Sequence, residues 1–116
     1  MCPFARGIVL LTLSTAVTVG SVQAQESVSS PKRGGELVKQ KACLGCHTVD
    51  KKRVGPGFKQ IADRYGKADV ATIEYLATSI RQGGAGKWGV VPMPAQSAVS
   101  KDEATDIAAW ILNLKE

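Results

Sequence analysis

The sequence predicts an all-α fold of four to five short helices in a single domain. Three observations lead to this prediction. Apolar residues recur at spacings of three and four over 69–82 and again over 100–114, as they do along one face of a helix. No segment alternates apolar and polar residues as a half-buried strand would, and no internal repeat is found. With 116 residues the chain is too short for more than one domain.

The first 24 residues have the three parts of a secretory signal peptide. A basic start is followed by an apolar run over 8–19 and by small or apolar residues at 22–24. The run is shorter than the ~20 apolar residues of a membrane-spanning helix. We therefore expect cleavage after Ala24, export to the periplasm and no stable membrane insertion. Cys2 would be lost with this leader, and the net charge would fall from +5 to +4 because Arg6 is the leader's only charged residue.

The mature chain is expected to start with a flexible segment, residues 25–33, that contains three serines and Pro31. The folded domain would then cover residues 34–116. Its first helix is predicted to start at about Gly35 and to run into the cysteine-containing stretch that follows.

Turn residues divide the middle of the chain. Residues 48–57 form a predicted loop, and a short helix over 58–65 is predicted to stop at Gly66. A longer helix is expected over 69–82, with Asp69 near its start and a glycine just past its end.

The segment 83–96 is too rich in glycine and proline for a regular helix, yet its stretch 90–94 is too apolar for a solvent-facing loop. It should cover something large and apolar. The last helix is predicted from a capping box, Ser100 and Glu103, to about Leu114.

The stretch Cys43-Leu44-Gly45-Cys46-His47 matches the attachment pattern of a c-type haem. Residues i and i+3 are neighbours on a helical turn, about 5–6 Å apart at Cβ. Two sulfurs at that spacing can form thioether bonds with the two vinyl groups of one haem. The adjoining imidazole of His47 then has a ring nitrogen for the iron. The sequence predicts one covalently attached haem c.

Two other interpretations of these residues are open but weaker. A zinc site would need further ligands, and the chain has no second histidine and, besides Cys2, no other cysteine. A thiol redox pair of the thioredoxin kind would need a strand–helix framework, and no strand-like segment precedes Cys43.

Met93 is the candidate for the sixth iron ligand. It is the only methionine besides Met1, and it lies between Pro92 and Pro94, which stiffen the backbone around it. Filling an irregular core gap is the ordinary role of a methionine. A histidine–methionine pair favours reduced iron and leaves no open position. This ligation therefore predicts single-electron transfer rather than catalysis.

From about Glu36 to its end, the chain resembles the class I c-type cytochromes, in particular the small soluble bacterial monohaem subgroup of the c-551 and c-552 type. The resemblance implies an all-α cytochrome c fold, with the first and last helices crossing and the haem in a crevice. The matching residues are Cys43, Cys46 and His47, Val54-Gly55-Pro56, Gly83-Gly84, Lys87-Trp88-Gly89, Val91-Pro92-Met93-Pro94 and Trp110-Ile111-Leu112.

The resemblance also implies roles for residues around the haem. The Pro56 carbonyl would accept the second ring N–H of His47, and Trp88 would donate its indole N–H to a haem propionate, with simple packing as the alternative. Arg81 could meet a propionate or remain a solvated helix-end cation. Gln96 stands where an asparagine often bonds the methionine sulfur in this subgroup, and its substitution could change the potential.

A mildly basic monomer suits transient docking on an acidic patch. We expect redox protein partners: a cytochrome complex, a reductase or a terminal oxidase. Lys51, Lys52 and Lys87 are candidates for the docking rim. Nucleic-acid binding is not expected, because the lysines are spread rather than clustered around aromatics. A permanently docked subunit of a larger complex, and a five-coordinate haem enzyme or gas-binding protein, are the competing functions.

Overall fold

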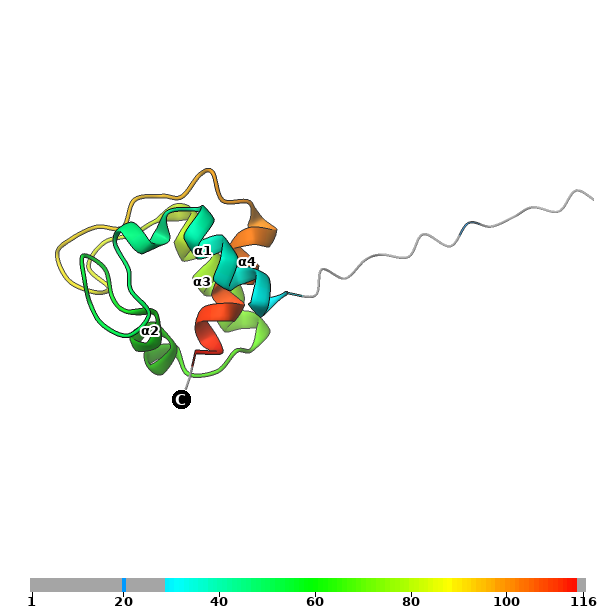
Figure 1. Ribbon diagram of the computed structural model, residues 1–116, viewed down its shortest axis with the longest axis horizontal. Coiled ribbons are helices and arrows are strands. Elements are labelled where there is room, and N and C mark those ends of the chain that lie inside the picture. The colour runs from blue at the N-terminus through cyan, green and yellow to red at the C-terminus, as the bar shows by residue number, and fades with distance from the viewer. Residues whose placement is uncertain (1–19, 21–28, 115–116) are drawn as a thin grey trace, which may run out of the picture.

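The computed structural model describes Gly20 and residues 29–114 (Figure 1). Apart from Gly20, the predicted signal peptide lies outside the described residues, as do the first residues of the predicted flexible segment, 25–28. The described part contains four α-helices and one turn of 3-10 helix. Its only β-type pairing is an isolated bridge between Gly84 and Met93. The all-α prediction is confirmed. The elements are α1 (Pro31–Gln40), η1 (Cys43–Gly45), α2 (Phe58–Tyr65), α3 (Val70–Gln82) and α4 (Lys101–Leu112).

Helix α1 differs from its prediction at both ends. It starts at Pro31 rather than near Gly35, so residues 31–33 are helical and their assignment to a flexible segment is wrong. Proline suits the first turn because it has no N–H to satisfy and its φ is already helical. The helix also does not run into the cysteine stretch. Ala42 takes a left-handed conformation with φ 57°, which separates α1 from η1.

A distant acidic side chain anchors the start of α1. Asp106, buried on α4, accepts a hydrogen bond from the backbone N–H of Ser30 at 2.6 Å and pairs with Arg33 at 3.2 Å. These contacts join residues more than seventy positions apart. Local composition carries no information about contacts between such distant residues. The predicted start of α1 near Gly35 is therefore later than its actual start at Pro31.

The other three helices follow their predictions closely. α2 ends at Tyr65 and is followed by Gly66, whose φ is 78°, and α3 is capped by Asp69, which accepts from the Thr72 N–H at 2.8 Å. α4 opens with the predicted reciprocal capping box of Ser100 and Glu103. It ends at Leu112, slightly before the predicted end.

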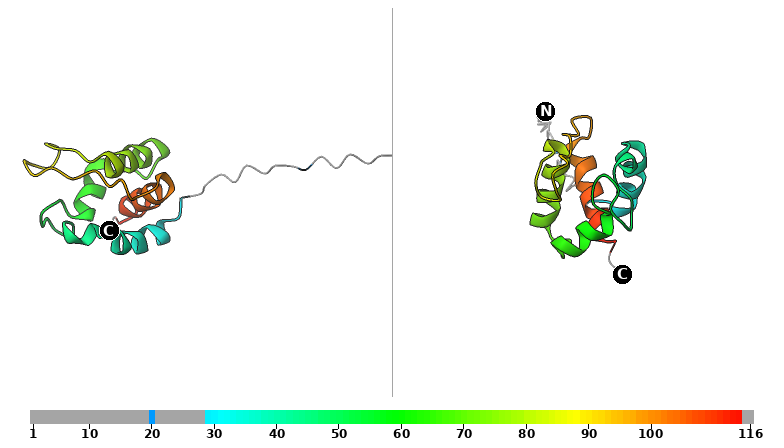
Figure 2. Two further views of the ribbon diagram at one scale, coloured as in Figure 1. Left: turned by 90° about the horizontal axis from the view of Figure 1, so that it is seen from above. Right: turned by 90° about the vertical axis from the view of Figure 1, so that its left-hand side faces the viewer.

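Helix α4 lies between α1 and α3, and its buried face forms the centre of the core (Figure 2). α1 packs directly on α4, as the resemblance implied. The contact is so close at Gly34 that a Cβ there would overlap the Asp106 carbonyl oxygen and come within 2.6 Å of Trp110 Cβ. Trp110 also meets the edge of Phe58 on α2, with ring centroids 5.2 Å apart. It is therefore a packing residue where the helices meet.

Candidate haem-binding site

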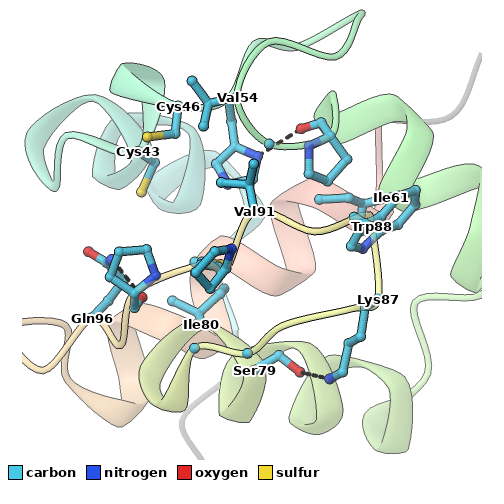
Figure 3. A pocket seen from close by; sticks show the side chains of 18 of the residues that line it. Cys43, Cys46, Val54, Ile61, Ser79, Ile80, Lys87, Trp88, Val91 and Gln96 are labelled. Carbon is cyan, nitrogen blue, oxygen red and sulfur yellow. Dashed lines mark hydrogen bonds between the residues drawn. The ribbon is translucent and has the colours of Figure 1, made fainter.

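One pocket collects residues from nearly every part of the described chain. It opens between the loop 48–57, the segment 83–96 and helices α2 and α3, with the cysteine stretch at one side (Figure 3). The segment 83–96 is non-helical and borders this pocket, so the prediction that it covers something large and apolar is consistent with its position. The apolar side chains of the lining include Val54, Ile61, Leu76, Ile80, Val91 and Ile111.

His47 is buried at the wall of the pocket, and its ring is held on three sides. Nδ1 lies 2.7 Å from the carbonyl oxygen of Pro56, which is the contact that the resemblance implied. Phe58 stacks on the ring with centroids 5.2 Å apart and planes inclined by 18°. On another side lies Gly55, where an added Cβ would come within 2.5 Å of the His47 Cε1.

The Pro56 contact determines which nitrogen of His47 can bind a metal. A carbonyl oxygen only accepts hydrogen bonds, so Nδ1 carries the proton and donates. In a neutral imidazole the other nitrogen, Nε2, then has a free lone pair. The structure therefore presents a metal-binding nitrogen whose orientation is fixed from behind.

The two cysteines lie side by side at the pocket edge. Both are free thiols and both line the pocket, Cys43 half-buried and Cys46 exposed. Burial raises the pKa of the Cys43 thiol, which favours the protonated thiol over a metal-binding thiolate. Over residues 29–114 no cluster of three or more metal-binding side chains is found, so the zinc alternative has no ligand set in this part of the chain.

Met93 reaches the same pocket from a different segment. Its backbone N–H donates to the Gly84 carbonyl at 2.8 Å, and its carbonyl accepts from the Gly84 N–H at 3.0 Å. Gly83, with φ 69°, lets the chain turn closely past the Met93 carbonyl at the end of α3. The bridge with Gly84 thus fixes the backbone position of Met93 relative to α3, while Pro92 and Pro94 stiffen it locally.

The far side of the pocket is polar. Lys87 and Ser79 lie across the pocket from the cysteines, and Lys87 Nζ donates to Ser79 Oγ at 3.3 Å (Figure 3). Trp88 is partly buried beside them. Ser79 was not among the sequence candidates, since a serine within an amphipathic helix carries no signal of its own. Its place in the pocket follows only from the packing of α3.

Two candidates bond to nearby backbone groups. The Gln96 side chain lines the pocket, and its amide donates to the Pro94 carbonyl at 2.9 Å. Arg81 does not line the pocket; its Nε donates to the Val99 carbonyl at 3.2 Å. Arg81 is exposed in the last turn of α3, which matches the expected helix-end cation rather than the propionate partner.

The segment 83–96 carries exposed apolar side chains and lies close to cations of the neighbouring loop. Val90 and Val91 are 95% and 59% exposed. Lys51 and Lys52 are exposed on the neighbouring loop, with Lys52 Nζ close to Gly89 of the segment 83–96.

These features fit a haem. Its flat apolar faces match the aliphatic lining, while its propionates, on the edge opposite the vinyl groups, match a polar end that lies across from the thiols. His47 offers an imidazole whose Nε2 is free to bind iron, and Met93 offers a neutral thioether; these are the ligand types found in electron-carrying haem proteins.

No helix within residues 29–114 has the length and hydropathy to cross a membrane.

Comparison with known proteins agrees with this site. The family model for cytochrome c matches residues 31–115. Cytochrome c-551 of Pseudomonas denitrificans is 49% identical over 82 residues, which are 71% of this chain and 98% of that protein. Cytochrome c-552 of Hydrogenobacter thermophilus is 46% identical over 81 residues, 69% of this chain and 80% of that protein.

The solved structures give the same result. The crystal structure of Nitrosomonas europaea cytochrome c552 is similar with a TM-score of 0.67 and 42% identity, over 70% of this chain and 99% of that one. Members of this family carry one covalently attached haem c and transfer electrons. The chain belongs to the cytochrome c family, as an electron-transfer protein of the c-551/c-552 type with haem c as its cofactor.

Proposed function

We propose that the protein is a periplasmic carrier of single electrons whose haem iron is bound by His47 and Met93. The observation that carries the proposal is that both residues line one pocket. His47 lies there with its Nδ1 2.7 Å from the Pro56 carbonyl oxygen, and Met93 is the only methionine of residues 29–114. Residues 1–24 act as the signal peptide in this proposal, and the folded domain begins with α1 at Pro31.

The haem supplies the redox chemistry, an iron that changes by one electron. The protein holds the haem and sets how strongly its iron favours the reduced state over the oxidised state. Cys43 and Cys46 form the thioether bonds, and the Met93 sulfur, a soft neutral ligand, raises the potential by favouring reduced iron. The apolar lining acts in the same direction, because a low dielectric disfavours the extra positive charge of the oxidised state.

The polar end of the pocket neutralises the haem edge. Trp88 donates its indole N–H to a propionate in this proposal, and the Lys87 ammonium beside Ser79 supplies a positive charge there. Gln96 has a second amide proton beyond the one bonded to Pro94, which leaves a donor for the Met93 sulfur.

Electrons pass to other redox proteins through the mouth of the pocket. An apolar surface with Val90 and Val91 exposed, flanked by Lys51 and Lys52, suits short encounters with an acidic partner. Replacing both lysines with glutamate should slow the reaction with such a partner at low salt. Unchanged rates would remove them from the docking surface.

The decisive experiment compares the Met93→Ala variant with the parent protein. The oxidised parent should show the weak sulfur-to-iron charge-transfer band in its optical spectrum, and the variant should lose the band and have a lower reduction potential. Val90→Ala is the matched control, because Val90 lies in the same segment and is 95% exposed. It should keep the band and the potential.

Carbon monoxide separates this proposal from a five-coordinate haem enzyme or gas-binding protein. The reduced parent should resist binding because Met93 occupies the sixth position, whereas Met93→Ala should bind readily. Ready binding by the parent would contradict the proposed ligation.

A further inference from the structure

We propose that Arg64 is a positioning residue that clamps the Met93 loop, residues 84–93, in its closed position. The side chain lies on α2 and holds the Lys87–Trp88 turn of the loop. It would thereby keep Met93 at the iron. The inference rests on the proposed function, because it assumes that Met93 is the ligand.

Apart from Trp88, which packs against the hydrophobic core, the Met93 loop has few contacts of its own. It is closed at the base by the bridge between Gly84 and Met93. Between these two residues, Val90 and Val91 are mostly exposed. A segment with little buried apolar surface opens at a low free-energy cost, so its closed position depends on the contacts that remain.

Arg64 makes two of these contacts at once. One guanidinium N–H donates to the backbone carbonyl of Lys87 at 2.6 Å. The guanidinium carbon lies 4.5 Å from the centre of the Trp88 ring. A planar guanidinium can bond in its plane and stack through its face at the same time, which an ammonium group cannot do.

Trp88 also packs against the hydrophobic core, and the Lys87 side chain contacts α3. Lys87 Nζ donates to Ser79 Oγ at 3.3 Å and lies 4.7 Å from the centre of the Tyr75 ring. This hydrogen bond is longer than the bond from Arg64, and it runs through a flexible side chain. Arg64 acts directly on the loop backbone, so its effect on the loop position should be the larger of the two.

Arg64 is not engaged by acidic side chains in any ion pair within residues 29–114. Its guanidinium is instead held by the Lys87 carbonyl and the aromatic faces of Trp88 and Tyr65. Since these contacts to the loop exist only when the loop is closed, they stabilise the closed state relative to an open one.

The consequence is measurable with a neutral competitor for iron. Imidazole can bind only when Met93 has left the iron, so its apparent affinity is proportional to the open fraction. Removing a contact that exists only in the closed state raises the open fraction and the affinity by the same factor.

The experiment is an imidazole titration of the oxidised holoprotein at a pH of about 8, where most imidazole is uncharged. Arg64→Gln should bind imidazole about tenfold more tightly than the parent, a factor equal to about 1.4 kcal/mol. Arg64→Lys, which keeps the charge but not the planar fork, should bind more tightly than the parent by a smaller factor. Lys67→Gln is the matched control, because it removes a nearby exposed positive charge that contacts no loop residue; its affinity should equal that of the parent.

Three results would overturn the clamp. Arg64→Gln could bind imidazole within about twofold of the parent. Lys67→Gln could show the same gain as Arg64→Gln, which would assign the effect to charge alone. A loss of helical circular dichroism by Arg64→Gln in the absence of denaturant would indicate general unfolding rather than loop opening. By contrast, absence of the sulfur-to-iron band in the parent would refute the proposed ligation, and the two failures are therefore distinguishable.

Discussion

Replacing Gly55 with alanine tests how tightly the protein holds the iron-binding histidine. The added Cβ would lie 2.5 Å from Cε1, 2.9 Å from Nδ1 and 3.0 Å from Nε2 of His47. Favourable contacts between carbon atoms need about 3.5–4.0 Å. The ring or the loop must therefore move by roughly 1 Å, and one face of the ring is already covered by the stacked Phe58.

The expected cost follows from two contributions. Overpacking a filled site costs about 1–3 kcal/mol. A shift of roughly 1 Å is enough to take Nδ1 from 2.7 Å beyond hydrogen-bond distance of the Pro56 oxygen, and a lost hydrogen bond costs about 0.5–1.5 kcal/mol. We expect Gly55→Ala to lower the free energy of unfolding by about 2–4 kcal/mol.

The assay is denaturant unfolding of the oxidised holoprotein, followed by the haem absorption. Gly45→Ala is the matched control, because a Cβ at Gly45, between the two cysteines, would meet nothing within 4 Å. The control should change stability by less than about 0.5 kcal/mol. If Gly55→Ala is as stable as this control, the conclusion that packing on Gly55 orients His47 is wrong.

Three further predictions concern the rest of the fold. Ala42→Gly should raise the free energy of unfolding by about 0.5–1 kcal/mol in denaturant titrations, because φ 57° is unfavourable for a residue with a Cβ; an unchanged or lower value would contradict this. The pKa of the Glu103 carboxyl is lowered, first by the hydrogen bond from the Ser100 N–H and next by the side-chain bond from Lys41. Its contribution is therefore complete above the ordinary value of 4.5 and is lost as the pH falls through the lower folded value. Glu103→Gln should remove that part of the acid-side decline in stability, and an unaltered decline would refute it. A chain with both Cys43 and Cys46 replaced by alanine should fail to retain haem and should lose most of its helical circular dichroism, because a domain this small has a marginal core without the apolar surface of the haem; full helicity would contradict the prediction.

Local sequence determined most of the secondary structure of this protein. α2, α3 and the start of α4 could be predicted because their signals lie within a few residues of each boundary: Gly66, Asp69 and the Ser100–Glu103 capping box. The same holds for the haem attachment stretch, since two thiols and an imidazole at this spacing have few other uses.

Tertiary structure decided how the elements meet. The start of α1 depends on Asp106, far along the chain, and the break at Ala42 separates that helix from the cysteines. A local pattern cannot contain such contacts, because the energy that selects them comes from groups that approach only after folding.

The same division applies to the pocket. Composition and spacing indicated His47 and Met93 as iron ligands, which remains the proposal. The folded chain places Ser79 across from the thiols, Gly55 against the imidazole and Arg64 on the turn of the Met93 loop. The types of iron ligand depend on which side chains are present, and the sequence determines that directly. The position, orientation and mobility of those ligands depend on packing between distant segments, which only the tertiary structure determines.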